Sequence, residues 1–282
     1  MKLARTSTAL TIAGYDPSGG AGVLADVRTF TALGLRASAA ITSVAFQNSN
    51  KVFGAIHQTA EAVRAQVEPL LDDFTVVCAK TGMLPTSEIV SEVARLFRET
   101  DLPAPVVDPV IVSSSGYKLM EDHALAALID QLLPLARLVT PNIPEAERLT
   151  GIAIKSESDM RRAATMIREL GAPAVLVKGG HLVSQKAGRR QRVENYEADQ
   201  IAEHNNDAID VLDDQGKVTV FRAKRIAGAE LHGSGCILSA AIAAGLGNGM
   251  TLEESVKAAK SFVLEAMRNS LQPGDEVSTT SR

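Results

Sequence analysis

Short apolar runs rich in β-branched residues alternate with amphipathic helical patterns along most of this 282-residue chain. Such alternation predicts βαβ units and a mainly parallel sheet with helices on both faces. The clearest helix lies at 156–170, because Ser156 and Asp159 fit a capping pair and Gly171 follows its last apolar residue. The predicted strands are 8–13, 37–44, 74–79, 104–108, 136–140 and 173–178, with a hairpin of 208–212 and 217–222. The predicted helices are 20–33, 60–71, 86–98, 121–133 and 156–170, with a buried helix over 237–245.

The domain organisation predicted from this pattern is simple. A chain of this length is ordinary for a single α/β domain, and we expect one domain over 1–271. A mixed run of basic and acidic residues at 183–206 interrupts the alternation, and such runs are typical of an exposed loop or flap. The polar residues 272–282 predict a disordered tail.

The composition is that of an ordinary globular protein, with 29 basic and 33 acidic residues and a net charge of -4. Nucleic acid is not expected as a partner, because the chain has no Trp, only three Tyr and no basic face interleaved with aromatic residues. The two cysteines, Cys78 and Cys236, lie far apart, which supports neither a disulfide framework nor a zinc site. We therefore expect a cytoplasmic protein. The N-terminal apolar run Ala9–Ala13 is too short for a signal or membrane segment, so no membrane association is expected.

A Gly-Ser-Gly turn leads directly into an apolar run of small residues near the C-terminal end, at Gly233, Ser234, Gly235 and Cys236. Glycines allow successive backbone N–H groups to converge, and the first turn of a helix adds unpaired amides and the positive end of its dipole. This arrangement predicts an anion site. The thiol pKa of a cysteine there is expected to fall from about 8.5 toward neutrality, which makes it a candidate proton acceptor. The alternative is a glycine-rich packing loop with a buried structural cysteine.

Polar residues follow several of the other predicted strands. Asp108, Asn142 and Glu145 have hard oxygen atoms suited to Mg²⁺, and Lys178 is suited to phosphate oxygens. Asn142 and Glu145 are equally consistent with capping of the helix after Pro144, and Lys178 with pairing to a carboxylate. Open α/β sheets bind ligands at the carboxyl ends of their strands, so we expect these residues to lie together.

Any phosphate binding must use a design other than the Gly-x4-Gly-Lys-Ser/Thr loop, which does not occur in the sequence. A glycine-rich turn at 14–22 follows the first predicted strand instead. The ordered motifs of the chain are 16–22, 25–26, 29–30, 47–48, 80–83, 140–142, 144–146, 178–181 and 232–236. On these motifs, and over roughly residues 8–270, the chain resembles the hydroxymethylpyrimidine and phosphomethylpyrimidine kinases of the ribokinase-like superfamily.

The resemblance implies a three-layer α/β/α fold and ATP-dependent phosphorylation of 4-amino-5-hydroxymethyl-2-methylpyrimidine, then of its monophosphate, in thiamin biosynthesis. It implies an anion hole at Gly233, Ser234 and Gly235, with Cys236 as the catalytic base. It also implies a substrate pocket with Gly14, Asp26, Gln47 and Met83, ATP contacts from Lys178 and Asn142, Mg²⁺ ligation by Asp108 and Glu145, and a homodimer.

The chemistry of these residues agrees with phosphoryl transfer. A loose transition state needs mainly positioning and charge neutralisation, so a weak base such as a thiolate suffices. The carboxamide of Gln47 offers one donor and one acceptor, which match a ring nitrogen and its amino neighbour and favour a pyrimidine. Two alternatives remain open: a pyridoxal or pyridoxine kinase of the same superfamily, and a non-catalytic protein that binds a vitamin precursor. The intact Gly233, Gly235 and Cys236 favour an enzyme.

Overall fold

The computed structural model describes residues 6–48, 51–113, 116–180, 207–226 and 232–270, whose strands form one nine-stranded sheet in the order β3-β2-β1-β4-β5-β6-β7-β8-β9. The strands that run parallel are β1 (Thr6–Tyr15), β2 (Ala37–Gln47), β4 (Phe74–Thr81), β5 (Val106–Val107), β6 (Leu138–Val139) and β7 (Ala174–Gly179). Antiparallel strands complete the two ends of the sheet, namely β3 (Val52–His57) at one end and β8 (Asp207–Asp214) with β9 (Lys217–Lys224) at the other. The predicted mainly parallel sheet is confirmed.

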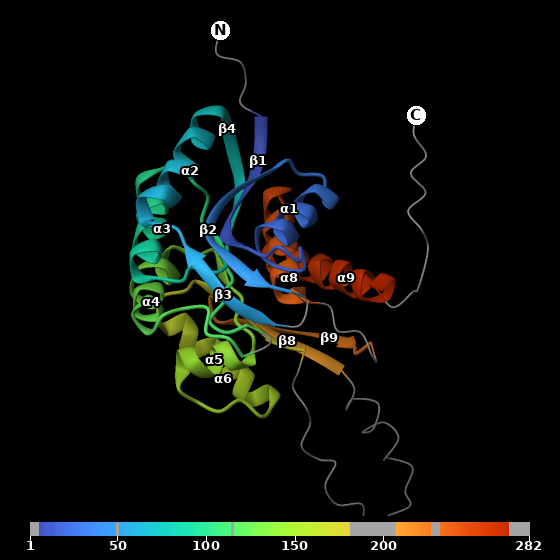
Figure 1. The fold of residues 1–282 in the computed structure, drawn as a ribbon. Helices are drawn as coiled ribbons and strands as arrows, with labels where there is room; N and C mark the ends of the chain where they lie inside the picture. The colour runs from blue at the N-terminus through green and yellow to red at the C-terminus, as the bar shows by residue number, and fades with distance from the viewer. Residues whose placement is uncertain (1–5, 49–50, 114–115, 181–206, 227–231, 271–282) are drawn as a thin grey trace, which may run out of the picture.

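Helices cover both faces of the sheet, as predicted (Figure 1). One layer contains α2 (Ala60–Asp73), α3 (Ser87–Glu99), α4 (Asp122–Ala127), α5 (Ile143–Thr150) and α6 (Glu157–Glu169). The other layer contains α1 (Gly22–Ala32), α8 (Ser234–Gly247) and α9 (Leu252–Ser270). Among the described helices, none combines the length and the apolar composition needed to cross a bilayer.

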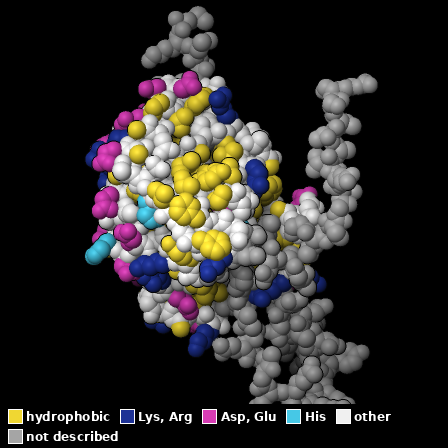
Figure 2. Space-filling view, viewed as in Figure 1, with side chains coloured by type: hydrophobic (Ala, Val, Ile, Leu, Met, Phe, Trp, Pro, Cys, Tyr) yellow, Lys and Arg dark blue, Asp and Glu magenta, His cyan; other side chains and the backbone are white. Residues whose placement is uncertain are grey.

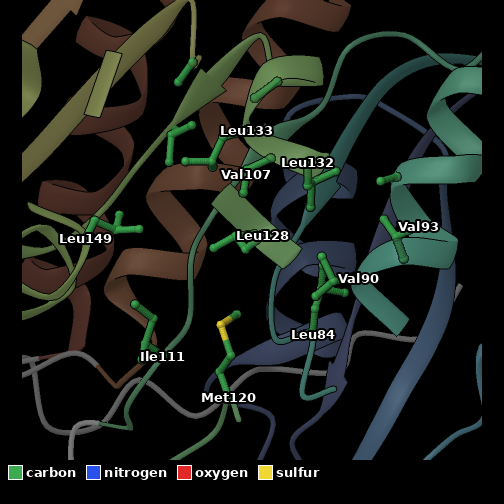
Figure 3. Close-up of a cluster of buried hydrophobic side chains, with 14 of the residues drawn as sticks. Leu84, Val90, Val93, Val107, Ile111, Met120, Leu128, Leu132, Leu133 and Leu149 are labelled. Carbon is green, nitrogen blue, oxygen red and sulfur yellow. The ribbon is translucent and has the colours of Figure 1, made fainter. Parts of the chain in front are cut away.

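A hydrophobic core fills the space between the sheet and the first of these layers (Figure 3). Val90 and Val93 of α3 point toward Leu128 and Leu132, and Val107 of β5 lies beside them (Figure 3). Each of these side chains is nearly or fully removed from solvent. Full burial of such a side chain is worth about 1.5–3 kcal/mol, so this core contributes much of the free energy that holds the layer on the sheet.

Two local predictions are confirmed in detail. The Ser156 hydroxyl accepts a hydrogen bond from the Asp159 backbone N–H at 3.1 Å, which caps the start of α6, and Gly171 follows the helix with a φ of 112°. The hairpin of β8 and β9 turns at Gln215 and Gly216, both with positive φ, which is the geometry of a two-residue type I′ turn.

The sequence prediction was wrong in three places. The predicted helix at 121–133 is broken into α4, a π-helical turn at Leu128–Leu132 and a 3₁₀ turn at Leu133–Leu135, since Pro134 has no N–H for a regular α-helix. Strand β3 and helix α9 were not predicted. The predicted flap at 183–206 and tail at 272–282 lie outside the described residues, so the single domain over 1–271 stays a prediction.

Candidate active site

The turn before α8 has the geometry of an anion site. Gly233 adopts a left-handed conformation with a φ of 76°, and a Cβ there would lie 2.1 Å from the carbonyl oxygen of Gly20. Only glycine fits both constraints. Ser234, Gly235 and Cys236 then form the start of α8, where backbone N–H groups have no intrahelical acceptor. The predicted convergence of amides at a helix N-terminus is therefore present.

Lys178, at the end of β7, reaches this turn. A Cβ at Gly235 would lie 3.1 Å from the Lys178 Nζ atom, so the glycine makes room for the ammonium group. The same Nζ atom donates to the Asp108 carboxylate at 2.8 Å, and the Thr140 hydroxyl lies 3.2 Å from that carboxylate. The pairing of Lys178 with a carboxylate, left open by the sequence, is thus confirmed. It places a positive charge directly beside the anion site.

Asn142 and Glu145 form a complete capping box at the start of α5. The Asn142 side chain accepts from the Glu145 backbone N–H at 2.9 Å, and the Glu145 carboxylate accepts from the Asn142 N–H at 2.8 Å. Burial raises the pKa of Glu145 to about 7. The negative charge of Asp108 also raises this pKa, whereas the positive charge of Lys178 lowers it. Asp108 and Glu145 therefore lie near enough for their charges to repel. Capping, one of the two alternatives for this pair, is confirmed, and it leaves their roles toward metal and ATP as predictions.

A buried ion pair that the sequence analysis missed lies beneath the turn. The Lys80 ammonium donates to the Asp26 carboxylate at 2.8 Å, both side chains are fully buried, and the Thr11 hydroxyl donates to the same carboxylate at 2.6 Å. Burial raises the pKa of Asp26, and the positive charge of Lys80 opposes that effect. Asp26, predicted to line the substrate pocket, is therefore enclosed. The sequence signal for this ion pair was Lys80 within an apolar strand, because a buried ammonium group needs a counter-charge.

The other residues predicted to bind substrate lie at the ends of β1, β2 and β4. A Cβ at Gly14 would lie 3.0 Å from the Met83 sulfur atom, so these two residues are in contact. The backbone carbonyl of Met83 accepts a hydrogen bond from the Thr42 hydroxyl at 2.6 Å, which fixes the position of Met83. Gln47 ends β2 and hydrogen-bonds through its side chain to Asp16. The structure thus places these residues on the same edge of the sheet as the anion site.

Cys236 lies among four charged groups, and its predicted pKa was wrong. Burial raises the pKa of the thiol to about 12, with further raising by the carboxylates of Asp108 and Asp26. The ammonium groups of Lys80 and Lys178 lower the pKa, but they do not outweigh desolvation. The thiol also hydrogen-bonds to Asp108. The prediction considered only the helix N-terminus, whereas burial has the larger effect here.

This environment predicts that neither thiol ionises near neutral pH. Cys78 is buried, and burial raises its pKa to about 12 as well. We expect the ultraviolet absorbance of thiolate in the folded, ligand-free protein to stay at baseline between pH 7 and about pH 9, and to rise fully only after denaturation. A titration midpoint below pH 9 that disappears in Cys236→Ala would contradict the raised pKa of Cys236.

Comparison with known proteins supports the family resemblance. The phosphomethylpyrimidine kinase family model matches residues 16–281. The hydroxymethylpyrimidine/phosphomethylpyrimidine kinase of Streptomyces coelicolor is 41% identical over 258 residues, which are 92% of this chain and 87% of that protein. The fold and the glycine-rich anion turn define a kinase of the ribokinase-like class. Within that class, the chain belongs to the phosphomethylpyrimidine kinase family.

Solved structures with the same fold include kinases for two different ring substrates. A phosphomethylpyrimidine kinase from Clostridium difficile 630 is 35% identical with a TM-score of 0.75, covering 93% of this chain and 100% of that chain. The pyridoxal kinase from Staphylococcus aureus, in complex with AMP-PCP and pyridoxal, is 30% identical with a TM-score of 0.79, covering 97% of this chain and 91% of that chain. The predicted ribokinase-like three-layer fold is confirmed.

Proposed function

We propose that this protein transfers the γ-phosphoryl group of ATP to the hydroxymethyl oxygen of 4-amino-5-hydroxymethyl-2-methylpyrimidine, and then phosphorylates the resulting monophosphate, in thiamin biosynthesis. The observation that carries the proposal is the anion site at the start of α8, with Lys178 beside it and Gln47 on the same sheet edge. Membership of the phosphomethylpyrimidine kinase family supports it. The absence of a membrane-crossing helix among the described residues is consistent with the cytoplasmic location that we also propose.

In the proposed reaction, the amides of residues 233–236 and the ammonium of Lys178 hold the phosphoryl oxygens and stabilise their charge. The substrate hydroxyl oxygen forms the new P–O bond while the bond to the ADP oxygen breaks. The hydroxyl proton passes late to Cys236 in its thiolate form, since in a loose transition state the attacking hydroxyl becomes acidic only when the new bond is nearly formed. The turn therefore supplies positioning and charge, and the thiolate supplies a proton acceptor.

The acidic residues fit a magnesium ion that is shared with a nucleotide. Among the described residues no group of three His, Cys, Asp or Glu could hold a metal ion by itself. Asp108 is paired with Lys178, and Glu145 lies near enough to both for their charges to act on it. Mg²⁺ is commonly held by one or two carboxylates together with phosphate oxygens and water, so this donor set is adequate. We propose that Asp108 and Glu145 bind Mg²⁺ and that Asn142 and Lys178 contact ATP. The metal would neutralise phosphate charge.

Pyridoxal kinase activity is the second candidate, because the pyridoxal kinase from Staphylococcus aureus has the same fold over nearly the whole chain. A coupled ADP-release assay with the aminopyrimidine, its monophosphate and pyridoxal distinguishes the candidates. We expect the aminopyrimidine and its monophosphate to be phosphorylated with higher kcat/KM than pyridoxal. Turnover of none of the three would favour a non-catalytic binding protein instead.

Substitution of Gln47 tests how the ring is recognised. Gln47→Met removes the donor and the acceptor while keeping a side chain of similar length. We expect kcat/KM for the aminopyrimidine to fall by about two orders of magnitude, because the polar edge of the ring would be left unpaired, and kcat/KM for pyridoxal to change much less. Equal losses for both substrates would show that the ring is recognised elsewhere.

An exposed apolar surface on β2 and β3 supports the proposed homodimer. Phe46, Phe53 and Ile56 are 47%, 64% and 60% exposed, and Figure 2 shows hydrophobic side chains gathered where β3 lies in Figure 1. Strand β3 is also the last strand of the sheet at this end. Apolar surface of this kind marks interaction sites, and we propose that a second copy of the chain covers it.

A charge placed on this surface tests the homodimer. We expect Phe53→Glu combined with Ile56→Asp to give a monomer by light scattering, because charged side chains at the centre of an apolar interface would be buried without partners. Met250, 44% exposed between α8 and α9, offers a matched control, and Met250→Glu should leave the dimer intact. A wild-type protein that is monomeric at micromolar concentration would contradict the proposal.

A further inference from the structure

Asp16, in the turn after β1, collects hydrogen-bond donors from three separate parts of the chain. Its carboxylate accepts from the Ser18 N–H at 2.8 Å, the Ser18 hydroxyl at 2.7 Å and the Ala21 N–H at 2.9 Å. The His232 Nε2 atom, just before the anion turn, lies 3.2 Å from the same carboxylate. The Gln47 side chain, at the end of β2, hydrogen-bonds to it as well. Asp16 is only 3% exposed, so these contacts take the place of water.

The carboxylate stays ionised in this position. Burial alone would raise the pKa of Asp16, but the hydrogen bonds from Ser18, Gln47 and Ala21 lower it below its ordinary value. An ionised carboxylate can only accept hydrogen bonds. Each partner must therefore present a hydrogen atom to Asp16, and that requirement fixes the orientation of groups that could otherwise be placed in two ways.

Gln47 is the partner for which this restriction matters most. A glutamine amide can rotate by a half-turn and exchange its oxygen and nitrogen, and a partner that both donates and accepts would permit both states. Asp16 permits one state, in which the Nε2 group of Gln47 faces the carboxylate. The Oε1 atom and the second N–H then remain for a ligand. These form an acceptor and a donor side by side.

That arrangement matches one edge of an aminopyrimidine. The exocyclic amino group donates, and the adjacent ring nitrogen accepts, so both pair with Gln47 only when its amide has the orientation described. The pyridoxal ring has no amino group beside its ring nitrogen. Under the proposed function, on which this argument rests, the fixed amide would therefore distinguish the two ring systems.

We propose that Asp16 is a positioning residue that fixes the amide of Gln47 and thereby sets the preference for an aminopyrimidine over pyridoxal. Asp16 does not touch the ring in this assignment. It acts through Gln47, and its contact with His232 joins the ring-binding side to the anion turn. Neither the anion turn nor the capping box at α5 needs to change for Asp16 to exert this effect.

Asp16→Asn tests the proposal, because asparagine has nearly the same shape but can donate as well as accept. We expect the ratio of kcat/KM for the aminopyrimidine to that for pyridoxal to fall by about tenfold or more, mainly through KM for the aminopyrimidine. A ratio of two substrates measured on one preparation does not depend on how much of the protein is folded. Asp159→Asn is the matched control, since Asp159 also accepts from a serine hydroxyl and a backbone N–H, far along the chain in α6, and the ratio should stay unchanged.

Two further variants separate orientation of Gln47 from general loosening of the turn. Ser18→Ala removes one donor to Asp16 but leaves Gln47 in place, and we expect the ratio to be retained. In a Gln47→Met background, Asp16→Asn should no longer change the ratio, because there is no amide left to orient. A fall with Ser18→Ala as large as with Asp16→Asn, or an equal fall in the Gln47→Met background, would overturn the proposal.

The wild-type protein separates this inference from the proposed function. Failure to phosphorylate the aminopyrimidine at all would overturn both. A clear wild-type preference for the aminopyrimidine that Asp16→Asn leaves intact would overturn only the role of Asp16.

Discussion

Cys236→Ala is expected to lower kcat by about two to four orders of magnitude, the range for loss of a proton acceptor. The backbone amides of the anion turn remain in this variant, so binding of phosphate and the melting temperature should change little. Steady-state kinetics with the aminopyrimidine, together with a thermal melt, measure both quantities. A change confined to kcat would be the result of losing an interaction that is made only in the transition state.

Cys78 provides the control, because it is the other cysteine and is buried, whereas Cys236 is partly buried. A Cβ at Gly247 would lie 2.8 Å from the Cys78 sulfur atom, so Cys78 packs beneath the end of α8, whereas Cys236 is at its start. Cys78→Ala should therefore lower the melting temperature while kcat stays within a few-fold of wild type. Near-normal turnover of Cys236→Ala would remove Cys236 from the mechanism.

The pH dependence of kcat provides an independent test of the same thiol. Because the pKa of Cys236 is raised to about 12, its thiolate is a minor form at neutral pH, and its population rises with pH throughout the accessible range. If the thiolate accepts the proton, kcat should keep rising from pH 7 to about pH 9 without levelling off. The helix N-terminus alone would predict a plateau of kcat near neutral pH, and such a plateau would contradict the raised pKa of Cys236.

The alternation of strands and helices predicted the sheet and both helical layers, because hydrophobic periodicity reports which side of an element is buried. Irregular elements could not be found in this way. The segment Val52–His57 contains Gly54 and has exposed apolar residues on an edge strand, so its pattern lacks the usual alternation. The interruption of the helix at 121–133 depends on where Pro134 falls relative to the packed turns around it.

The position of candidate site residues at the sheet edge was predictable where a strand end or a glycine-rich turn marks them, as at Gly14, Gln47 and Lys178. The pairing of such residues could not be predicted. Asp26 and Lys80, for example, are 54 positions apart in the sequence and meet only in the folded chain. The effect of burial on Cys236 is hidden for the same reason. A sequence shows the local helix start but not the depth at which the fold places it.

The largest effect on stability is expected from Lys80→Met, which would leave the Asp26 carboxylate buried without its counter-charge. Removing one partner of a buried ion pair costs about 3–5 kcal/mol, and we expect a loss of that size in the free energy of unfolding from urea denaturation. Lys217→Met is the control, since Lys217 pairs with Glu253 on the surface, and it should leave the free energy of unfolding nearly unchanged. A Lys80→Met protein as stable as wild type would show that Asp26 is neutral in the folded state.

The double variant Lys80→Met with Asp26→Leu separates stability from function. Replacing a buried ion pair by apolar side chains is often neutral for stability, so the double variant should recover most of what the single variant loses. Turnover should not recover fully, because the loss of Lys80 raises the pKa of Cys236 more than the loss of Asp26 lowers it, and the thiolate becomes still scarcer. A double variant that regains stability but not kcat would mean that the ion pair serves the charge environment of the Cys236 thiol. Recovery of both stability and kcat would mean that apolar side chains can replace the pair without loss of function.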